Sequence, residues 1–197
     1  MCIACREAGW LHRDPGSGWA RPLFHEETTC GSPILLVYEA PNFGDTYDPQ
    51  KGRLTCNRTT DPSGRFTHRL LEHVGLRPED VIITNSVLCL PARGRDRGFP
   101  VFVQQRKTCA RWLRRFIVDL DIEVVVTCGA NALEATRLVH RHEIILAESV
   151  GVVVDWFDRK LLPLYHSSAL GRLNRPEPRQ FVDIEALLPF VSTPEAG

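Results

Sequence analysis

The chain has 197 residues, with 24 basic and 24 acidic side chains, so its formal net charge at pH 7 is zero. This balance excludes a protein that is held on nucleic acid by bulk charge alone, although it leaves room for a local basic rim. The composition, 43% hydrophobic and 24% charged, is typical of a globular domain, and no apolar run approaches the roughly 20 residues of a membrane span. We expect one domain over residues 1–197, in the cytoplasm, because the N-terminus lacks the features of a signal peptide.

The N-terminal segment, residues 1–32, shows little periodicity and is rich in Gly, Pro, His and Trp. It opens with Cys2-Ile3-Ala4-Cys5, a spacing suited to tethering such a segment. A first buried strand is predicted over Ile34–Tyr38, and a polar turn from Glu39 to Asp45 follows it. Residues 46–64 are predicted to form a long polar loop, which in a compact domain is more often functional than idle.

Helices and strands alternate in the middle of the chain. Apolar residues at helical spacing predict a helix over Arg65–His73. The β-branched run that begins at Val81 predicts a strand covered on both faces, which ends at Thr84-Asn85. A basic loop from Arg93 to about Pro100 leads into a second predicted helix over residues 103–118.

The last third of the chain continues this alternation. The predicted elements are a strand over Ile122–Thr127, a helix through Val139, one or two short strands within residues 144–154, a strand over Leu161–Tyr165, a helix over Pro178–Leu188 and a flexible tail at 190–197. Strands that alternate with helices indicate a three-layer α/β/α fold with a central, mainly parallel four-stranded sheet.

Polar side chains follow three of the predicted strands, and ligands of such sheets bind beyond the carboxyl ends of the strands. The amide of Asn85 offers a donor and an acceptor side by side, which match the O4 and N3–H edge of uracil. His166 is suited to donate to O2, where charge develops as an N-glycosidic bond breaks, and Glu39 to steady the sugar cation or orient water. The structural alternatives are a strand-end cap, a packed surface histidine and a turn cap.

The seven cysteines are an odd number in a chain without a secretory signal, which favours metal ligation over a disulfide framework. Four of them suit either an iron–sulfur cluster or tetrahedral zinc: Cys2, Cys5, Cys89 and Cys109. The other three, Cys30, Cys56 and Cys128, are expected to be small buried side chains or idle thiols.

Three motifs together resemble the uracil-DNA glycosylase superfamily, and most closely its iron–sulfur (family four) branch. They are Glu39-Ala40-Pro41, then Ile83-Thr84-Asn85 with Cys89 and Pro91, then His166-x-Ser168. That branch usually reads Gly-Glu-Ala-Pro-Gly, Thr-Asn-x-x-x-Cys-x-Pro-Pro and His-Pro-Ser, with four cysteines in the same order as here. The resemblance extends from Cys2 to about Leu188.

The resemblance implies an enzyme that removes a flipped uracil from DNA and leaves an abasic site, with Asn85 reading the base, His166 stabilising O2 and Glu39 near the water or sugar. It implies a structural [4Fe–4S] cluster on the four cysteines named above, and a monomer that binds DNA. The residues implied to line the base pocket are Ala40, Pro41, Asn42, Phe43 and Ser168. Those implied to meet DNA are Leu170, as a wedge in a loop from Ala169 to Arg172, together with Arg172, Arg93 and Arg95.

Several positions depart from the family pattern. Tyr38 and Asn42 replace the two glycines of the first motif, and Ser167 replaces the proline of the last. The family's stacking motif, Gly-Arg-Pro-Phe-Val-Gly, has no clean match, so Phe43 or Tyr47 becomes the candidate for the stacking ring.

These departures keep alternatives open. Asn42 could admit another deaminated base, such as hypoxanthine or xanthine. The chain could be an inactive member of the fold that binds DNA or a protein. It could also be an α/β enzyme with a structural zinc ion that acts on a free nucleoside. Covalent trapping of DNA, which one branch performs, is not expected, because no histidine lies between Cys89 and Cys109.

Overall fold

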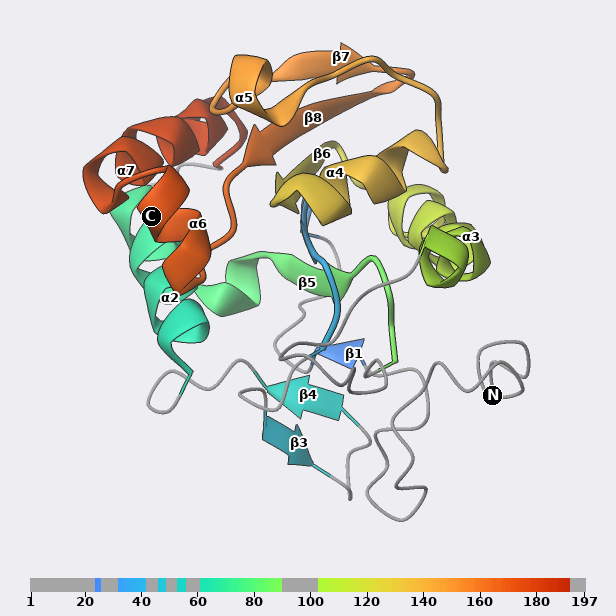
Figure 1. The fold of residues 1–197 in the computed structure, drawn as a ribbon, viewed down its shortest axis with the longest axis horizontal. Helices are drawn as coiled ribbons and strands as arrows, with labels where there is room; N and C mark the ends of the chain where they lie inside the picture. Colours follow the sequence, from blue (N-terminus) through green and yellow to red (C-terminus); the bar gives the residue numbers. More distant parts are fainter. Residues whose placement is uncertain are drawn as a thin grey trace, which may run out of the picture.

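A five-stranded sheet in the order β5-β2-β6-β8-β7 forms the centre of the molecule (Figure 1). In this computed structural model the described residues are 24–25, 32–41, 46–48, 53–55, 61–89 and 103–191. The parallel strands are β5 (Ile82–Asn85), β2 (Ile34–Tyr38), β6 (Val124–Cys128) and β8 (Arg159–Leu164). All four were predicted, and the three-layer fold is confirmed.

The fifth strand is β7 (Val154–Trp156), which pairs antiparallel with β8 at the edge of the sheet. The predicted sheet of four strands is therefore one strand too small. Only two residues, Phe157 and Asp158, separate β7 from β8, and Phe157 adopts the positive φ of 44° that so tight a turn requires. The short strands predicted within residues 144–154 are not found as such, because Leu146–Ser149 form a helix and β7 begins only at the last residue of that range. With three residues, β7 is too short to show the alternation that identifies a strand.

A second, smaller sheet has the order β1-β4-β3 and lies below the main one in Figure 1. Its strands are β1 (Phe24–His25), β4 (Arg53–Thr55) and β3 (Thr46–Asp48). Because β3 and β4 pair antiparallel, part of the segment predicted as a long polar loop is a hairpin. The polar composition of these residues shows no alternation of apolar and polar side chains that would predict strands.

Helices cover both faces of the main sheet, and a separate apolar core fills each interface. On one face lie α2 (Pro62–His73), α7 (Glu177–Ile184) and the 3₁₀ turns of η2 (Glu185–Phe190). On the other face lie α3 (Val103–Asp119) and α4 (Ala130–Arg137). Alternate residues of β2 serve the two cores, Leu36 the first and Leu35 and Val37 the second, which explains the continuous apolar run.

The bounds of some helices differ from the sequence prediction. Helix α2 starts earlier, because Asp61 caps it by accepting hydrogen bonds from the N–H groups of Ser63 (3.1 Å) and Gly64 (2.8 Å). The predicted helix over Pro178–Leu188 is divided into α7 and η2.

The segment predicted as a loop from Ala169 to Arg172 is the start of a short helix, α6 (Ala169–Asn174). The Ser168 side chain caps α6 by accepting from the N–H of Gly171 at 3.3 Å. Six residues are too few to show helical periodicity in the sequence.

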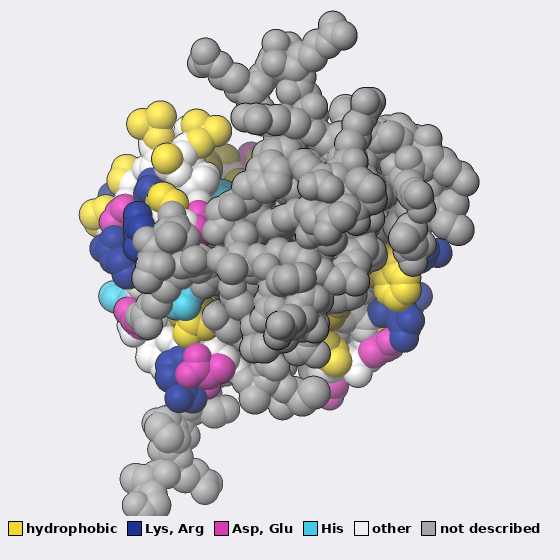
Figure 2. Space-filling model, turned by 90° about the horizontal axis from the view of Figure 1, so that it is seen from below, with side chains coloured by type: hydrophobic (Ala, Val, Ile, Leu, Met, Phe, Trp, Pro, Cys, Tyr) yellow, Lys and Arg dark blue, Asp and Glu magenta, His cyan; other side chains and the backbone are white. Residues whose placement is uncertain are grey.

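The remaining short elements are η1 (Pro78–Asp80) and α5 (Leu146–Ser149). Among the helices that the structure describes, none is long and apolar enough to cross a membrane. On the face seen in Figure 2, described basic and acidic side chains are interspersed around the rim, in keeping with the zero net charge.

Candidate active site

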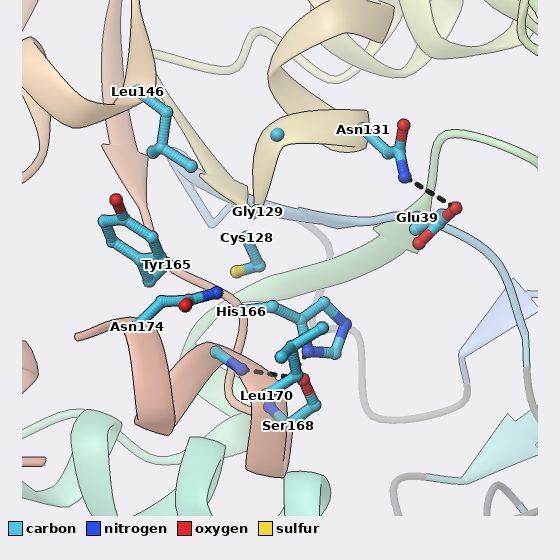
Figure 3. Close-up of a pocket in the computed structure, with 12 residues that line it drawn as sticks. Glu39, Cys128, Gly129, Asn131, Leu146, Tyr165, His166, Ser168, Leu170 and Asn174 are labelled. Atoms are coloured by element: carbon cyan, nitrogen blue, oxygen red, sulfur yellow. Dashed lines mark hydrogen bonds between the residues drawn. The ribbon is translucent and has the colours of Figure 1, made fainter. Parts of the chain in front are cut away.

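A pocket of about 430 Å³ opens at the carboxyl edge of the main sheet, beside the first turns of α4 and α6 (Figure 3). Glu39 follows β2, Cys128 ends β6, and Tyr165 and His166 follow β8, so three neighbouring strands contribute to it. Ser168 and Leu170 complete the rim on the side of α6. The prediction that polar strand-end residues meet at one edge is confirmed for Glu39, His166 and Ser168.

The ring of His166 is held in one tautomer. Its Nδ1 accepts a hydrogen bond from the N–H of Ser168 at 2.9 Å, so the proton of the neutral ring sits on Nε2. Figure 3 shows this second nitrogen turned toward the side of the pocket where Glu39 lies. Burial lowers the pKa of His166, and the charge of Asp61 raises it by less, so the ring is neutral at neutral pH and donates from Nε2.

Two glycines allow the backbone to enclose His166. A Cβ on Gly171 would lie 1.8 Å from the carbonyl oxygen of His166, so α6 can approach this closely only with glycine there. Gly129 has a φ of +100°, and its Cβ would lie 3.2 Å from that of His166. The position of the imidazole therefore depends on the first turns of both α4 and α6.

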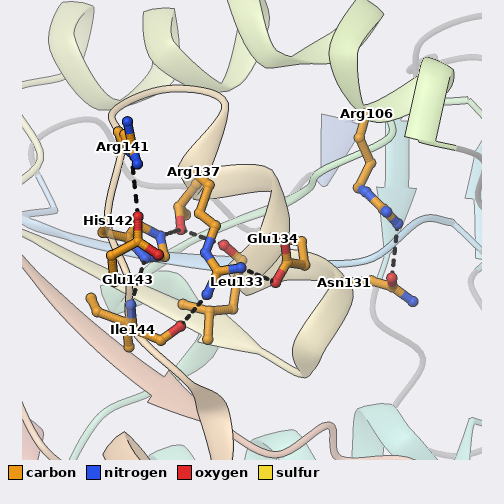
Figure 4. Close-up of polar contacts among 10 residues, drawn as sticks. Arg106, Asn131, Leu133, Glu134, Arg137, Arg141, His142, Glu143 and Ile144 are labelled. Atoms are coloured by element: carbon orange, nitrogen blue, oxygen red, sulfur yellow. Dashed lines mark hydrogen bonds and ion pairs between the residues drawn. The ribbon is translucent and has the colours of Figure 1, made fainter.

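The carboxylate of Glu39 is engaged by a side chain that the sequence interpretation did not single out. Asn131, in the first turn of α4, donates from Nδ2 to Oε1 of Glu39 at 2.8 Å. Arg106 of α3 in turn donates from Nη1 to Oδ1 of Asn131, also at 2.8 Å (Figure 4). No local signal predicts these contacts, because the partners are 92 and 25 residues apart in the chain.

Glu39 is subject to opposing electrostatic effects. Burial raises the pKa of this carboxyl, and it is the largest effect. The hydrogen bond from Asn131 and the charge of Arg106 both lower the pKa.

Asn85 ends β5 and is 3% exposed. Among the described residues that line the pocket, Glu39 and His166 are present but Asn85 is not. The backbone nevertheless joins the two strand ends, since Ser86 donates from its N–H to the carbonyl of Tyr38 at 2.7 Å and from Oγ to that of Glu39 at 2.7 Å. The role of Asn85 in reading a base stays a prediction.

The two described candidates for DNA contact differ in their surroundings. Leu170 is 67% exposed at the rim of the pocket, as a wedge would require. Arg172 is engaged within the protein, where Nη1 donates to the carbonyl of Ser167 at 3.1 Å and the guanidinium lies over the ring of Phe66 at 5.3 Å. These contacts hold α6 against α2, and a contact of Arg172 with DNA stays a prediction.

Pro41 is buried, and Ala40, which precedes it, is partly exposed. Several other predicted site residues lie outside the described part of the chain: Cys2, Cys5, Asn42, Phe43, Arg93 and Arg95, together with the side chain of Tyr47. Their assignments stay predictions.

The described cysteines are all buried. Cys89, after β5, is 2% exposed and Cys109, in α3, is 4% exposed. Within the described ranges, no group of three or more His, Cys, Asp or Glu side chains could hold a metal ion. Cys128 is a buried thiol, as predicted, and burial raises its pKa to about 12, so it is protonated.

Two sequence comparisons match most of the chain to known proteins. A sequence model of the Uracil DNA glycosylase superfamily matches residues 26–188. The chain is also 31% identical to a protein named Type-4 uracil-DNA glycosylase from Thermotoga maritima, over 161 residues that cover 80% of this chain and 77% of that protein. The chain therefore belongs to the uracil-DNA glycosylase superfamily, as its motifs predicted.

Proposed function

We propose that the chain is a DNA glycosylase of base-excision repair, which hydrolyses the N-glycosidic bond of a flipped uracil and leaves an abasic site. The observation that carries the proposal is the pairing, in one pocket, of a neutral His166 that donates from Nε2 with a partly buried carboxylate on Glu39. The type-4 name of the similar protein supports the same activity.

The histidine acts on the leaving base. As the bond between C1′ of the sugar and N1 of uracil breaks, the electron pair moves onto the base and charge accumulates on O2. The Nε2–H of His166 donates to that oxygen, and because the ring is fixed by Ser168 it needs no reorientation during the reaction. Removal of one such donor typically costs about 100- to 1,000-fold in rate.

The carboxylate acts on the sugar. Ionised Glu39 stabilises the oxocarbenium-like cation that forms at C1′ and orients a water for attack on that carbon. The proton of the water passes to the carboxylate as the new C–O bond forms.

Recognition of the base falls to Asn85, with Ala40, Pro41, Asn42, Phe43 and Ser168 around the base. Flipping costs a few kcal/mol, which the exposed Leu170 offsets by entering the base stack. Phosphates are met by Arg93, Arg95 and Arg172, and also by the N-terminus of α4, which lines the pocket and whose dipole favours anions.

A [4Fe–4S] cluster on Cys2, Cys5, Cys89 and Cys109 is part of the proposal. The two of these thiols that the structure describes are buried and soft, as cluster ligands are, and the similar protein carries a type-4 name. The cluster would join the N-terminal segment to β5 and α3 and would take no part in breaking the bond. Zinc on the same thiols is the alternative. We propose a monomer that acts on DNA in the cytoplasm.

The test is incubation with a duplex that contains a single uracil, followed by alkaline cleavage of abasic sites. Wild-type protein should cut at the uracil, and Asn85→Ala and His166→Ala should each lose about 100-fold or more in single-turnover rate. His73→Ala, at the exposed C-terminal end of α2, is the matched control and should keep full activity. Absence of cleavage for uracil, hypoxanthine and xanthine alike would leave the inactive DNA-binding alternative in place.

A further inference from the structure

We infer that Asn131 and Arg106 are positioning residues, which together hold the Glu39 carboxylate in the orientation that hydrolysis requires. The inference rests on the proposed function of Glu39 and names residues outside the motifs of the family. It stands on a chain of two hydrogen bonds that joins α3, α4 and the end of β2.

Arginine fixes which way round the amide of Asn131 lies. A guanidinium only donates hydrogen bonds, so the oxygen of the Asn131 amide must face Arg106. The amide nitrogen then must face Glu39, where it donates to Oε1 at 2.8 Å. Without Arg106 the amide could turn over and place its oxygen against the carboxylate.

The second carboxylate oxygen is left for the reaction. The contact with Asn131 uses Oε1, and Figure 3 shows the other oxygen of Glu39 turned toward the part of the pocket where His166 lies. The hydrogen bond from Asn131 thus fixes Oε1 of Glu39 and leaves the other carboxylate oxygen facing the pocket.

The helix that carries Asn131 is itself firmly held. Arg137 of α4 donates from Nη2 to the carbonyl of Ile144 at 2.6 Å, and Thr136 is bonded to Nε2 of His142 at 2.8 Å (Figure 4). These bonds tie α4 to the segment that follows it. They support the C-terminal end of the helix whose first turn carries Asn131.

The same contacts favour the ionised form of Glu39, although they do not outweigh burial, which raises its pKa. Among the described groups that face this carboxylate, Arg106 carries a positive charge and His166, across the pocket, is neutral. Burial favours the protonated acid, and the two positioning residues oppose it. A carboxylate that loses them both turns more freely and takes up a proton at higher pH.

Three substitutions separate these effects. Asn131→Leu keeps the size and removes the hydrogen bonds, Asn131→Asp faces Glu39 with a second carboxylate, and Arg106→Gln removes the charge. Each should lower the single-turnover rate of uracil excision, by up to about 100-fold, because small misplacements of a catalytic group have effects of that size. The acid limb of the pH–rate profile should move to higher pH, furthest in Asn131→Asp, because like charges disfavour ionisation. Binding of the uracil duplex should stay near that of wild type.

Two controls make the result specific to Glu39. Arg114→Gln removes a charge from an exposed position of the same helix α3 and should leave rate and pH profile unchanged. In the background of Glu39→Gln, which cannot ionise, adding Asn131→Leu should have little further effect, as expected for residues that act through one another.

The inference is overturned if Asn131→Leu retains the wild-type rate and acid limb, if its rate falls while the acid limb stays in place, or if the loss persists in the Glu39→Gln background. Titration of the Glu39 carboxyl by ¹³C NMR, which needs no turnover, must show a higher pKa in Asn131→Leu than in wild type. An unchanged NMR titration refutes the positioning role, whereas a wild-type protein that excises no base refutes the proposed function.

Discussion

Tyr38 and Ser167, two of the residues that depart from the family motifs, are joined behind His166. The hydroxyl of Tyr38 is bonded to Oγ1 of Thr67 at 2.6 Å, and Thr67 lies 3.1 Å from Oγ of Ser167. The ring of Tyr38 also meets the imidazole of His166 edge-on, with centroids 5.4 Å apart. In the sequence the two departures are 129 positions apart and look independent, whereas in the structure they form one support for the turn that carries His166.

The Gly171 position gives a prediction at the residue scale. In Gly171→Ala the new methyl group would meet the carbonyl of His166 at 1.8 Å, so α6 or the His166 turn must shift. We expect a loss of about 1–3 kcal/mol in the free energy of unfolding, typical of overpacking, and a large fall in the rate of uracil excision. Chemical denaturation and single-turnover assays measure the two quantities.

The matched control is Gly75→Ala, at the end of α2. An added methyl group meets nothing within 4 Å there, and the φ of +76° alone costs about 1–2 kcal/mol. Stability should fall while activity survives. Full activity in Gly171→Ala would show that the close approach of α6 to His166 does not position the ring.

The elements that sequence alone predicted are those whose apolar pattern is long enough to read. Strands β2, β5, β6 and β8 are covered on both faces and appear as apolar runs. Strand β7 and helix α6, with three and six residues, are too short for periodicity, and the polar hairpin of β3 and β4 resembles a loop. The strand ends located Glu39 and His166, but the contacts of Asn131 and Arg106 arise only when α3 and α4 pack together.

Helix α2 supports a prediction about its first turn. Asp61 caps the helix through two N–H groups, and its charge also raises the pKa of His166. Asp61→Ala removes both and should cost about 1 kcal/mol in unfolding free energy. Asp61→Asn keeps a capping oxygen but removes the charge, so most of the stability should remain.

Both variants should lower the pKa of His166. Without the negative charge of Asp61 the pKa of His166 falls further, so the ring stays neutral to lower pH than in wild type. Titration of the His166 ring protons by NMR should show this shift in both variants, and thermal denaturation should separate them. A His166 titration that is unchanged in both would mean that Asp61 acts on the helix alone.

At the scale of the whole molecule, two of the proposed cluster ligands lie close in the chain to residues proposed to act at the site. Cys89 follows Asn85 by four residues beyond β5, and Cys109 follows Arg106 by three on α3, about one helical turn. Anything that fixes these two thiols would therefore also steady the residue proposed to read the base and the residue proposed to position Glu39 through Asn131.

Loss of the cluster should consequently affect stability and activity together. Wild-type protein purified without oxygen should be brown, with a broad absorption band in the visible range, and contain iron and sulfide. Cys89→Ser and Cys109→Ser should be pale, melt at lower temperature and excise uracil more slowly, because cluster binding contributes to folding free energy. Cys128→Ser, a buried thiol outside the proposed ligand set, should keep the colour. A colourless wild-type protein that contains one equivalent of zinc would replace the cluster by the zinc alternative, and equal colour in Cys109→Ser and Cys128→Ser would remove Cys109 from the ligand set.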